Sequence, residues 1–293
     1  MAQPLLTRLK QSGATIDVLA PEWVAPVARR MPEVSDVIGA PLRHGRMQLR
    51  SRWRLAREVR RRGYDQAFVL PNTWKSALVP FLAGIPTRVG YTGESRYGLL
   101  NVRTPKSNSP MPQHYARLAG GPDAGLTPPR LEVFPEEIEE TKRRFALAGS
   151  YVVLCPGAEY GPAKRWPYFG ELAEKLGPRA VVLGSEKDAE TGVALPGLNL
   201  IGKTTLDEAI RLIAGADAVV SNDSGLMHVA AALGRPQVAL FGSSSPLHTP
   251  PASDKARVLW LHLECSPCFA RECPLGHFRC MREIGVEEVL KLL

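Results

Sequence analysis

The chain has 293 residues, of which 44% are hydrophobic and 23% charged, and this size and composition favour two folded domains over one. No apolar run approaches the ~18 to 20 residues that cross a bilayer, and the first residues lack the apolar segment of a signal peptide, so we expect a cytoplasmic protein. The formal charge of +8 favours an acidic partner, which can be a nucleotide, a nucleic acid or an anionic membrane surface.

Helices and strands alternate in the first part of the chain. The apolar patterns predict helices over 4–11 and 22–30 and strands over 15–19 and 34–38. Such alternation is typical of a parallel sheet. A doubly wound domain normally opens with a strand and a glycine-rich turn, whereas this chain begins inside the first helix. We therefore expect the first domain to lack its first strand.

The segment 43–62 is strongly basic, with nine arginines and one glutamate. Leu49, Trp53 and Val59 contribute to a rough apolar stripe, so the segment predicts a basic amphipathic helix suited to anionic lipid headgroups. Nucleic-acid phosphates are an alternative, but no helix-turn-helix, RNP-like or zinc-finger signature accompanies the arginines, and we expect no nucleic acid. A solvated helix face without a partner is the remaining alternative.

A polar loop, 71–76, follows the strand predicted at 66–70 and precedes a helix. Substrates of parallel sheets lie at such strand ends. The candidate substrate contacts here are Asn72, Lys75, Arg88 and Arg96, with surface packing as the alternative for the arginines. A stretch rich in proline, glycine, serine and asparagine, 104–129, then leaves the first domain. We place the first domain at 1–135 and the second at 136–293.

The second domain opens with a strand at 151–155 and the loop 156–167. Its glycines and the adjacent cations Lys164 and Arg165 suit a pyrophosphate, although this loop is a weak signal by itself. The next strand, 180–183, ends at Glu186, whose carboxylate is suited to bind vicinal hydroxyls. The alternative for Glu186 is a first-turn helix residue that interacts with the helix dipole.

A strand, a polar turn and a small-residue helix follow one another over 216–233. The free backbone N–H groups at such a helix start form a seat for an anion. Gly225 would let a phosphate approach the backbone, Asp223 can accept hydrogen bonds from sugar hydroxyls, and His228 can face the same ligand. An ordinary N-cap with a core histidine is the alternative. Together with the polar loop 243–246, four loops at strand ends converge in one domain. This repetition is a more specific sign of a ligand site than any single loop.

Four cysteines lie close together near the end of the chain. They are Cys265, Cys268, Cys273 and Cys280, in C-x2-C-x4-C-x6-C spacing with His277 among them. A cytoplasmic setting argues against disulfides, so a zinc site or a metal cluster is possible chemistry for these thiols. Only the first pair has a common zinc-knuckle spacing, and we assign no metal, with a structural role as the alternative. Cys155, at a strand end, is expected to be packed in the core.

A known family carries segments similar to four stretches of this chain. These are SNDSGLMHVAAALGRPQVALFGSSSP from Ser221, LPNTWKSALVPFLAGIPTRVGYTGESRYGLLN from Leu70, CPGAEYGPAKRWP from Cys155 and CSPCFARECPLGHFRC from Cys265. On these segments the chain resembles the lipopolysaccharide heptosyltransferases, glycosyltransferase family 9, over nearly its whole length. The resemblance implies an inverting enzyme with an α/β, GT-B fold: two Rossmann-like domains facing a cleft, the first without its first strand. It implies that domain 1–135 binds the acceptor and that domain 136–293 binds the nucleotide sugar. The implied acceptor contacts are Asn72, Lys75, Arg88 and Arg96.

The resemblance implies transfer of L-glycero-D-manno-heptose from ADP-heptose to the first heptose of the lipopolysaccharide inner core. Lys164 matches the family's phosphate-binding lysine, and Glu186 aligns with a residue that contacts the ribose. The implied donor-binding residues are Lys164, Glu186, Asp223, Ser224, Gly225, Leu226 and His228. Lys164 and the amides around Ser224 and Gly225 would stabilise the leaving diphosphate without a metal, so we expect no cofactor.

The implied partners are ADP-heptose, a lipid A–Kdo–heptose acceptor and the anionic inner face of the inner membrane, on which the enzyme would be peripheral. The family's acidic base lies in the missing first turn, so the base is unassigned, with His228 and Glu159 as the next candidates. We therefore expect the chain as written to transfer heptose poorly or not at all. A binding module without a base is one alternative. An NAD-dependent oxidoreductase is another, which is disfavoured because no G-x-G-x-x-G follows a strand.

Overall fold

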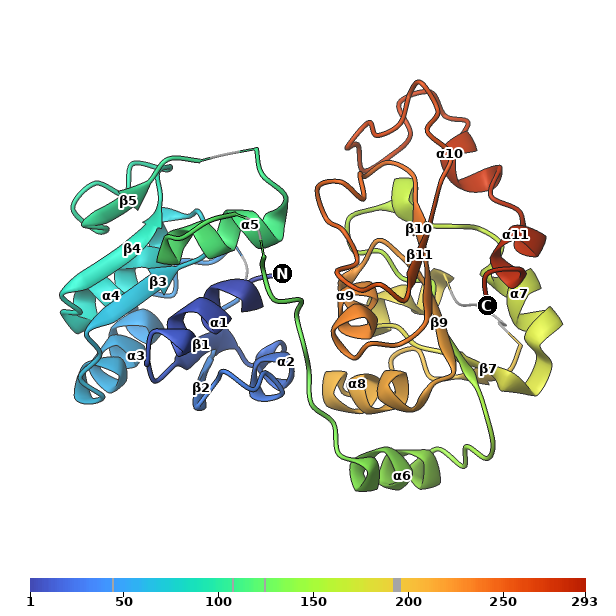
Figure 1. Cartoon of the computed structure of the whole chain (residues 1–293), viewed down its shortest axis with the longest axis horizontal. Helices are drawn as coiled ribbons and strands as arrows, with labels where there is room; N and C mark the ends of the chain where they lie inside the picture. Colours follow the sequence, from blue (N-terminus) through green and yellow to red (C-terminus); the bar gives the residue numbers. More distant parts are fainter. Residues whose placement is uncertain (44, 107, 124, 192–195) are drawn as a thin grey trace. The chain divides into compact units, whose positions relative to one another are not determined.

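The computed structural model describes residues 1–43, 45–106, 108–123, 125–191 and 196–293. The chain divides into two compact units (Figure 1): unit 1 contains residues 1–29 and 33–127, and unit 2 contains residues 30–32 and 128–293. The boundary expected at 135/136 therefore lies inside unit 2. The reason is that Leu131 is buried and its backbone N–H donates to the carbonyl oxygen of Ala232 at 2.9 Å.

Unit 1 is built of short alternating helices and strands. The helices are α1 (Gln3–Gln11), α2 (Ala25–Arg29), α3 (Leu49–Arg61), α4 (Leu78–Ala83) and α5 (Met111–Ala116), with 3-10 turns η1 (Trp74–Ala77) and η2 (Arg117–Ala119). The strands are β1 (Asp17–Pro21), β2 (Asp36–Ala40), β3 (Gln66–Val69), β4 (Thr87–Tyr91) and β5 (Val102–Thr104). All pairings are parallel, as predicted, but in the described ranges they make two sheets, β1-β2 and β3-β4-β5, instead of one.

Helix α3 confirms the amphipathic helix expected in the arginine-rich segment. It begins only at Leu49, because the preceding Gln48 has a left-handed backbone with φ 46°. Leu55, Ala56 and Val59 are buried in a core shared with α4 and β2, since they lie on one face of the helix. Leu49 and Trp53 are instead 59% and 55% exposed, so the apolar residues do not form a single stripe.

Unit 2 holds one six-stranded parallel sheet of order β11-β10-β9-β6-β7-β8. The strands are β6 (Val152–Cys155), β7 (Ala180–Val182), β8 (Leu198–Asn199), β9 (Ala218–Asn222), β10 (Gln237–Phe241) and β11 (Ala256–Trp260). The chain adds strands outward from β6 in one direction through β8, and then from β9 in the other direction. The switch point of the topology therefore lies between β6 and β9, where ligands of doubly wound sheets bind.

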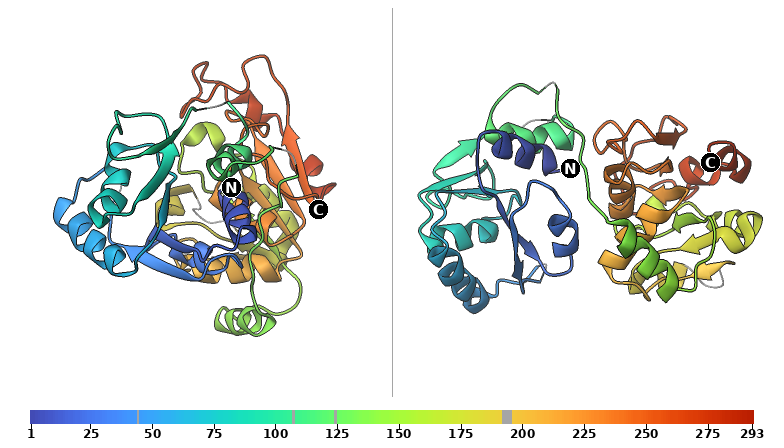
Figure 2. Two further views of the ribbon diagram at one scale, coloured as in Figure 1. Left: turned by 60° about the vertical axis from the view of Figure 1, so that its left-hand side comes forward. Right: turned by 60° about the horizontal axis from the view of Figure 1, so that its bottom comes forward.

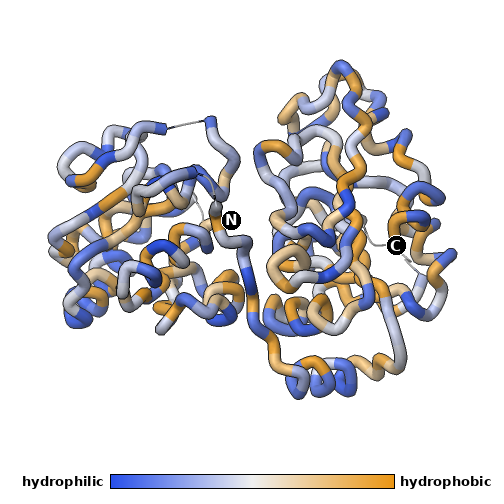
Figure 3. Tube along the Cα trace, in the orientation of Figure 1, coloured by the Kyte–Doolittle hydropathy of each residue, from blue (hydrophilic) through white to orange (hydrophobic). Residues whose placement is uncertain are grey.

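Helices cover both faces of this sheet (Figures 1 and 2). They are α6 (Pro135–Arg144), α7 (Phe169–Leu176), α8 (Leu206–Gly215), α9 (Gly225–Ala232), α10 (Arg279–Arg282) and α11 (Val286–Leu290), with 3-10 turns η3 (Pro162–Lys164), η4 (Gly177–Arg179) and η5 (Glu186–Thr191). Every residue of β6, β9 and β10 is buried, as expected for strands covered on both faces. Figure 3 shows these strands mostly in hydrophobic orange and α6 mostly in hydrophilic blue. Among the described residues, no helix combines the length and apolar character that a membrane crossing needs.

Candidate functional site

The loops that follow β6 and β9 meet through an ion pair. The Lys164 ammonium lies 2.5 Å from Oδ2 of Asp223, and the Ser244 hydroxyl from the loop after β10 donates to the same oxygen at 2.6 Å. The side chains of Asp223 and Lys164 are 6% and 16% exposed. The pair fixes the position of the ammonium at the switch point of the sheet. Asp223 thus holds Lys164, a contact that the expected role in binding sugar hydroxyls did not include.

Asn222, which sequence reasoning missed, anchors the Lys164 loop at both ends. Its amide nitrogen donates to the carbonyl oxygen of Pro156 at 2.8 Å, and its amide oxygen accepts from the backbone N–H of Trp166 at 3.1 Å. Asn222 is fully buried, so both bonds are shielded from water. A polar residue that ends an otherwise apolar buried strand is the signal that could have identified it.

The start of helix α9 is open to an anion. Ser224 occupies the N-cap position but makes no side-chain cap hydrogen bond, and its hydroxyl instead lies 3.1 Å from that of Ser221. A Cβ added at Gly225 would meet no heavy atom within 4 Å. The alternative of an ordinary side-chain cap is therefore wrong for Ser224, and the Asp223 carboxylate is bonded to Lys164 and Ser244. Helix α9 thus begins without a side-chain cap, two residues after the carboxylate that holds the Lys164 ammonium.

Leu226 and His228 lie in the first turns of α9 and are partly buried. Burial lowers the pKa of His228, so its imidazole is neutral at pH 7. A neutral imidazole offers one donor and one acceptor and adds no positive charge to the Lys164 site. The structure therefore places His228 on the predicted element, half-buried instead of packed wholly in the core.

Glu186 is exposed at the start of η5, at the end of the next strand, so its carboxylate is accessible to solvent. Two residues later, Asp188 is buried and accepts from the backbone N–H and hydroxyl of Ser185 at 2.9 and 2.7 Å. A Cβ added at Gly157 would lie 2.5 Å from the carboxyl carbon of Asp188. Gly157 therefore serves the close packing of two loops, which the sequence did not indicate.

The predicted acceptor residues of unit 1 have two different environments. Arg96 is 2% exposed and donates to the carbonyl oxygens of Pro71 and Tyr91 and to the side-chain oxygen of Asn72. Arg88 donates to the carbonyl oxygens of Leu99 at 2.7 Å and Ile85 at 2.5 Å. The structure thus favours the packing alternative for both arginines, of which Arg96 shapes the loop around Asn72. Lys75 is half-buried and, within the described ranges, its ammonium has no ion pair.

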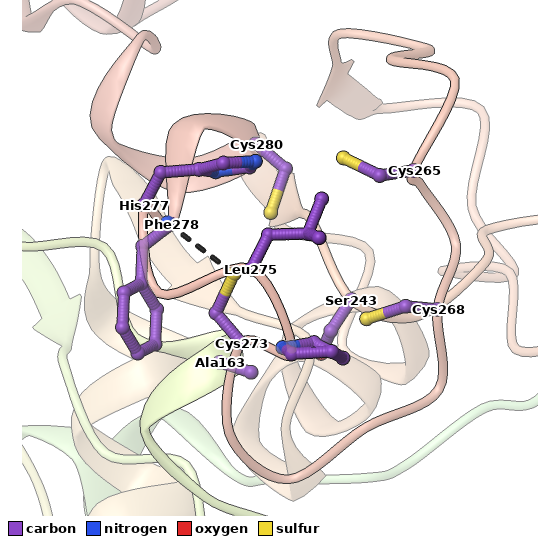
Figure 4. A pocket seen from close by; sticks show the side chains of 10 residues that line it. Ala163, Ser243, Cys265, Cys268, Cys273, Leu275, His277, Phe278 and Cys280 are labelled. Atoms are coloured by element: carbon purple, nitrogen blue, oxygen red, sulfur yellow. Dashed lines mark hydrogen bonds between the residues drawn. The ribbon is translucent and has the colours of Figure 1, made fainter.

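The four clustered cysteines, at 265, 268, 273 and 280, line one pocket of unit 2 together with His277 (Figure 4). Burial and the three neighbouring thiols raise the pKa of Cys280 to about 11, whereas backbone N–H groups lower the pKa of Cys273. Among the described residues, no three His, Cys, Asp or Glu side chains lie close enough together to hold a metal ion. Cys155 is buried in β6, as expected, and burial raises the pKa of its thiol to about 12.

Comparison with known proteins decides the family. Residues 52–279 match the model of glycosyltransferase family 9 (heptosyltransferase). The chain belongs to this family. It is 43% identical to lipopolysaccharide heptosyltransferase 2 of Escherichia coli K12, over 100% of this chain and 93% of that protein. It is 45% identical to lipooligosaccharide heptosyltransferase 2 of Haemophilus influenzae, over 87% of this chain and 82% of that protein.

A solved structure supports the same assignment. The ADP-heptose LPS heptosyltransferase II of E. coli matches with a TM-score of 0.87 at 41% identity, over 99% of this chain and 92% of that chain. The predicted family, the α/β fold of GT-B type and the glycosyltransferase class of this family 9 member are confirmed. The roles of single residues remain predictions.

Proposed function

We propose that this family 9 glycosyltransferase moves L-glycero-D-manno-heptose from ADP-heptose to the first heptose of the lipopolysaccharide inner core. The observation that carries the proposal is the Lys164 ammonium, fixed by Asp223 beside the open start of α9 at the switch point of the unit 2 sheet. Full-length similarity to a lipopolysaccharide heptosyltransferase 2 supports the choice of donor and acceptor.

The proposed chemistry is a displacement at the anomeric carbon of the donor. An acceptor hydroxyl forms the new C–O bond while the bond to the diphosphate breaks. The hydroxyl proton is released to solvent, and negative charge grows on the departing phosphate. Lys164 and the first N–H groups of α9 stabilise that charge, because both are fixed before the reaction and need no reorganisation. Glu186, exposed at the neighbouring strand end, is the proposed ribose contact. The neutral His228 binds the donor through a hydrogen bond.

A transfer assay with defined acceptors tests this proposal. The protein is incubated with ADP-heptose and either lipid A–Kdo or lipid A–Kdo–heptose, and ADP release and product mass are measured. We expect whatever transfer occurs to go only to the acceptor that already carries heptose. Transfer to lipid A–Kdo alone would contradict the proposal that the acceptor already carries heptose. Donor binding without any turnover would support the alternative of a binding module.

We also propose that helix α3 holds the enzyme on an anionic membrane surface at the inner face of the inner membrane. Its outward face presents Leu49 and Trp53 among Arg50, Arg54 and Arg57, all exposed. The Arg57 guanidinium lies 4.8 Å from the centroid of the Trp53 ring, so cationic and apolar groups occupy one patch. An apolar side chain flanked by arginines suits the boundary between acyl chains and phosphate headgroups.

A further inference from the structure

The four clustered cysteines come from different parts of the C-terminal segment and face a common space. Cys265, Cys268 and Cys273 lie on the loops between β11 and α10, and Cys280 lies on α10. Figure 4 shows their sulfur atoms around one pocket, with the Leu275 side chain drawn between them and Phe278 at one side. Thiols separated by up to 15 positions in the sequence are therefore gathered by the fold.

The turn after Cys273 is shaped around its sulfur atom. The backbone N–H of Phe278 donates to Sγ of Cys273 at 3.4 Å, and the N–H of Gly276 donates to the carbonyl oxygen of Cys273 at 3.0 Å. Gly276 has a φ of +69°, which a residue with a side chain rarely adopts. The turn therefore holds Sγ of Cys273 in the pocket that the other three cysteines also line.

We propose that Cys265, Cys268, Cys273 and Cys280 bind one Zn²⁺ ion through their four sulfur atoms. Four thiolates fill the tetrahedral coordination of Zn²⁺ and leave no position for water, so the site is structural. The thiols lose their protons to solvent as the Zn–S bonds form. Since no three potential ligands in the described ranges lie close enough as they stand, Zn²⁺ binding requires the sulfur atoms to move closer together.

The same segment supports the loop that carries Lys164. Between Cys268 and Cys273, the carbonyl oxygen of Phe269 accepts from the Tyr160 hydroxyl at 2.6 Å, and that of Arg271 accepts from the backbone N–H of Ala163 at 3.0 Å. A metal ion that ties the ends of this segment therefore positions the Lys164 loop. This second step rests on the proposed donor site, whereas the metal site itself does not.

Metal content and thiol protection test the site. The intact protein is purified without added metal, stripped under reducing conditions and titrated with Zn²⁺ and with Co²⁺. We expect one equivalent of Zn²⁺, loss of four reactive thiols, and the sulfur-to-cobalt absorption of a tetrahedral thiolate site. Cys273→Ser should weaken Zn²⁺ binding at least about tenfold. Cys155→Ser is the matched control, because Cys155 is buried in β6, and it should bind like the parent.

Three results would overturn the zinc site: thiols that stay reactive in excess Zn²⁺, disulfides among the four cysteines in protein denatured without reductant, or equal Zn²⁺ affinity in the two variants. If Cys273→Ser does not fold, the thiol and cobalt measurements on the parent still decide. ADP affinity of the stripped and Zn²⁺-loaded forms tests the second step, and we expect the loaded form to bind ADP more tightly. Equal affinity would overturn only the positioning of Lys164, and no ADP binding by either form would overturn the donor site.

Discussion

Lys164 is held close to the start of helix α9 by its pair with Asp223, which precedes the N-cap residue Ser224. Lys164→Ala should weaken ADP binding by about 1 to 3 kcal/mol, the usual size of a lost charge-assisted hydrogen bond. Calorimetric titration with ADP measures the change, and a thermal melt checks that the variant is folded. Lys187→Ala is the control, because Lys187 is exposed and pairs 3.3 Å away with the exposed Glu159. Equal affinity of Lys164→Ala and the parent would exclude a phosphate role for Lys164.

Substitutions at two glycines distinguish a role in ADP binding from a role in packing. Gly225→Ala should leave stability nearly unchanged, since its Cβ would enter open space, and should weaken ADP binding because that space lies before the α9 amides. Gly157→Ala should instead destabilise the fold by about 1 to 3 kcal/mol, because its Cβ would lie 2.5 Å from the carboxyl carbon of Asp188. Urea denaturation and ADP titration of both variants measure the effects. A stable Gly225→Ala protein with full ADP affinity would place the anion elsewhere.

Helix α6 is tied to its surroundings by Glu137. The carboxylate accepts from the backbone N–H of Phe134 at 3.0 Å and pairs with Arg30 at 2.9 Å, and the Arg30 guanidinium lowers the pKa of Glu137 from 4.5 to about 2. A pKa lowered by folding gives stability that is present above the unfolded value and lost as pH falls through the folded value. Unfolding free energy should therefore drop between about pH 4.5 and pH 2.

Replacing Glu137 tests this dependence on pH. Glu137→Gln should reduce stability at pH 7 and flatten the acid loss, as measured by urea denaturation at a series of pH values. Glu139→Gln is the control, because Glu139 lies on the same helix with a side chain 57% exposed. An unchanged acid slope in Glu137→Gln would show that other carboxylates govern the acid loss.

Helix α3 yields a prediction about lipid binding. Arg54→Gln should weaken binding to anionic vesicles by about 1 kcal/mol, the usual contribution of a basic side chain near such a surface, and Trp53→Ala should weaken it through lost apolar burial. Co-sedimentation with anionic and zwitterionic vesicles measures both effects. Trp23→Ala is the control, since Trp23 is 70% exposed but lies outside α3. If Trp23→Ala reduced binding as much as Trp53→Ala, α3 would not be the contact.

The whole molecule consists of two compact units, and the proposed ADP contacts lie in unit 2. Ligand binding stabilises the folded state that binds it, by about 2.7 kcal/mol when free ligand is at 100 times its Kd. We expect calorimetric unfolding to show two transitions, and we expect ADP to raise the midpoint temperature of one of them. Hydrogen exchange shows which unit ADP stabilises, because amides in β6 and β9 should exchange more slowly when ADP is bound. Equal protection of amides in β3 and β4 would contradict separate units.

The sequence alone determined the elements of this protein and the positions of its strand-end loops. Apolar runs and polar turns are local signals, and carboxyl ends of parallel strands lie at one edge of a sheet, so the loops at Lys164, Glu186 and Asp223 could be predicted as one site. The arginine-rich helix was also readable, because its 3.6-residue period depends only on neighbouring residues.

Only the tertiary structure decided which groups bond to each other. Lys164 and Asp223 are 59 positions apart, and their contact follows from β6 lying beside β9 in the sheet. The positive charge of Arg96 suggested an acceptor contact, yet folding buries its guanidinium, whose two terminal nitrogens donate to oxygens of Pro71, Asn72 and Tyr91. The apolar side chains of α3 likewise point to different environments, because α4 covers Val59 and leaves Trp53 exposed. Side-chain partners depend on long-range packing, which no local pattern encodes.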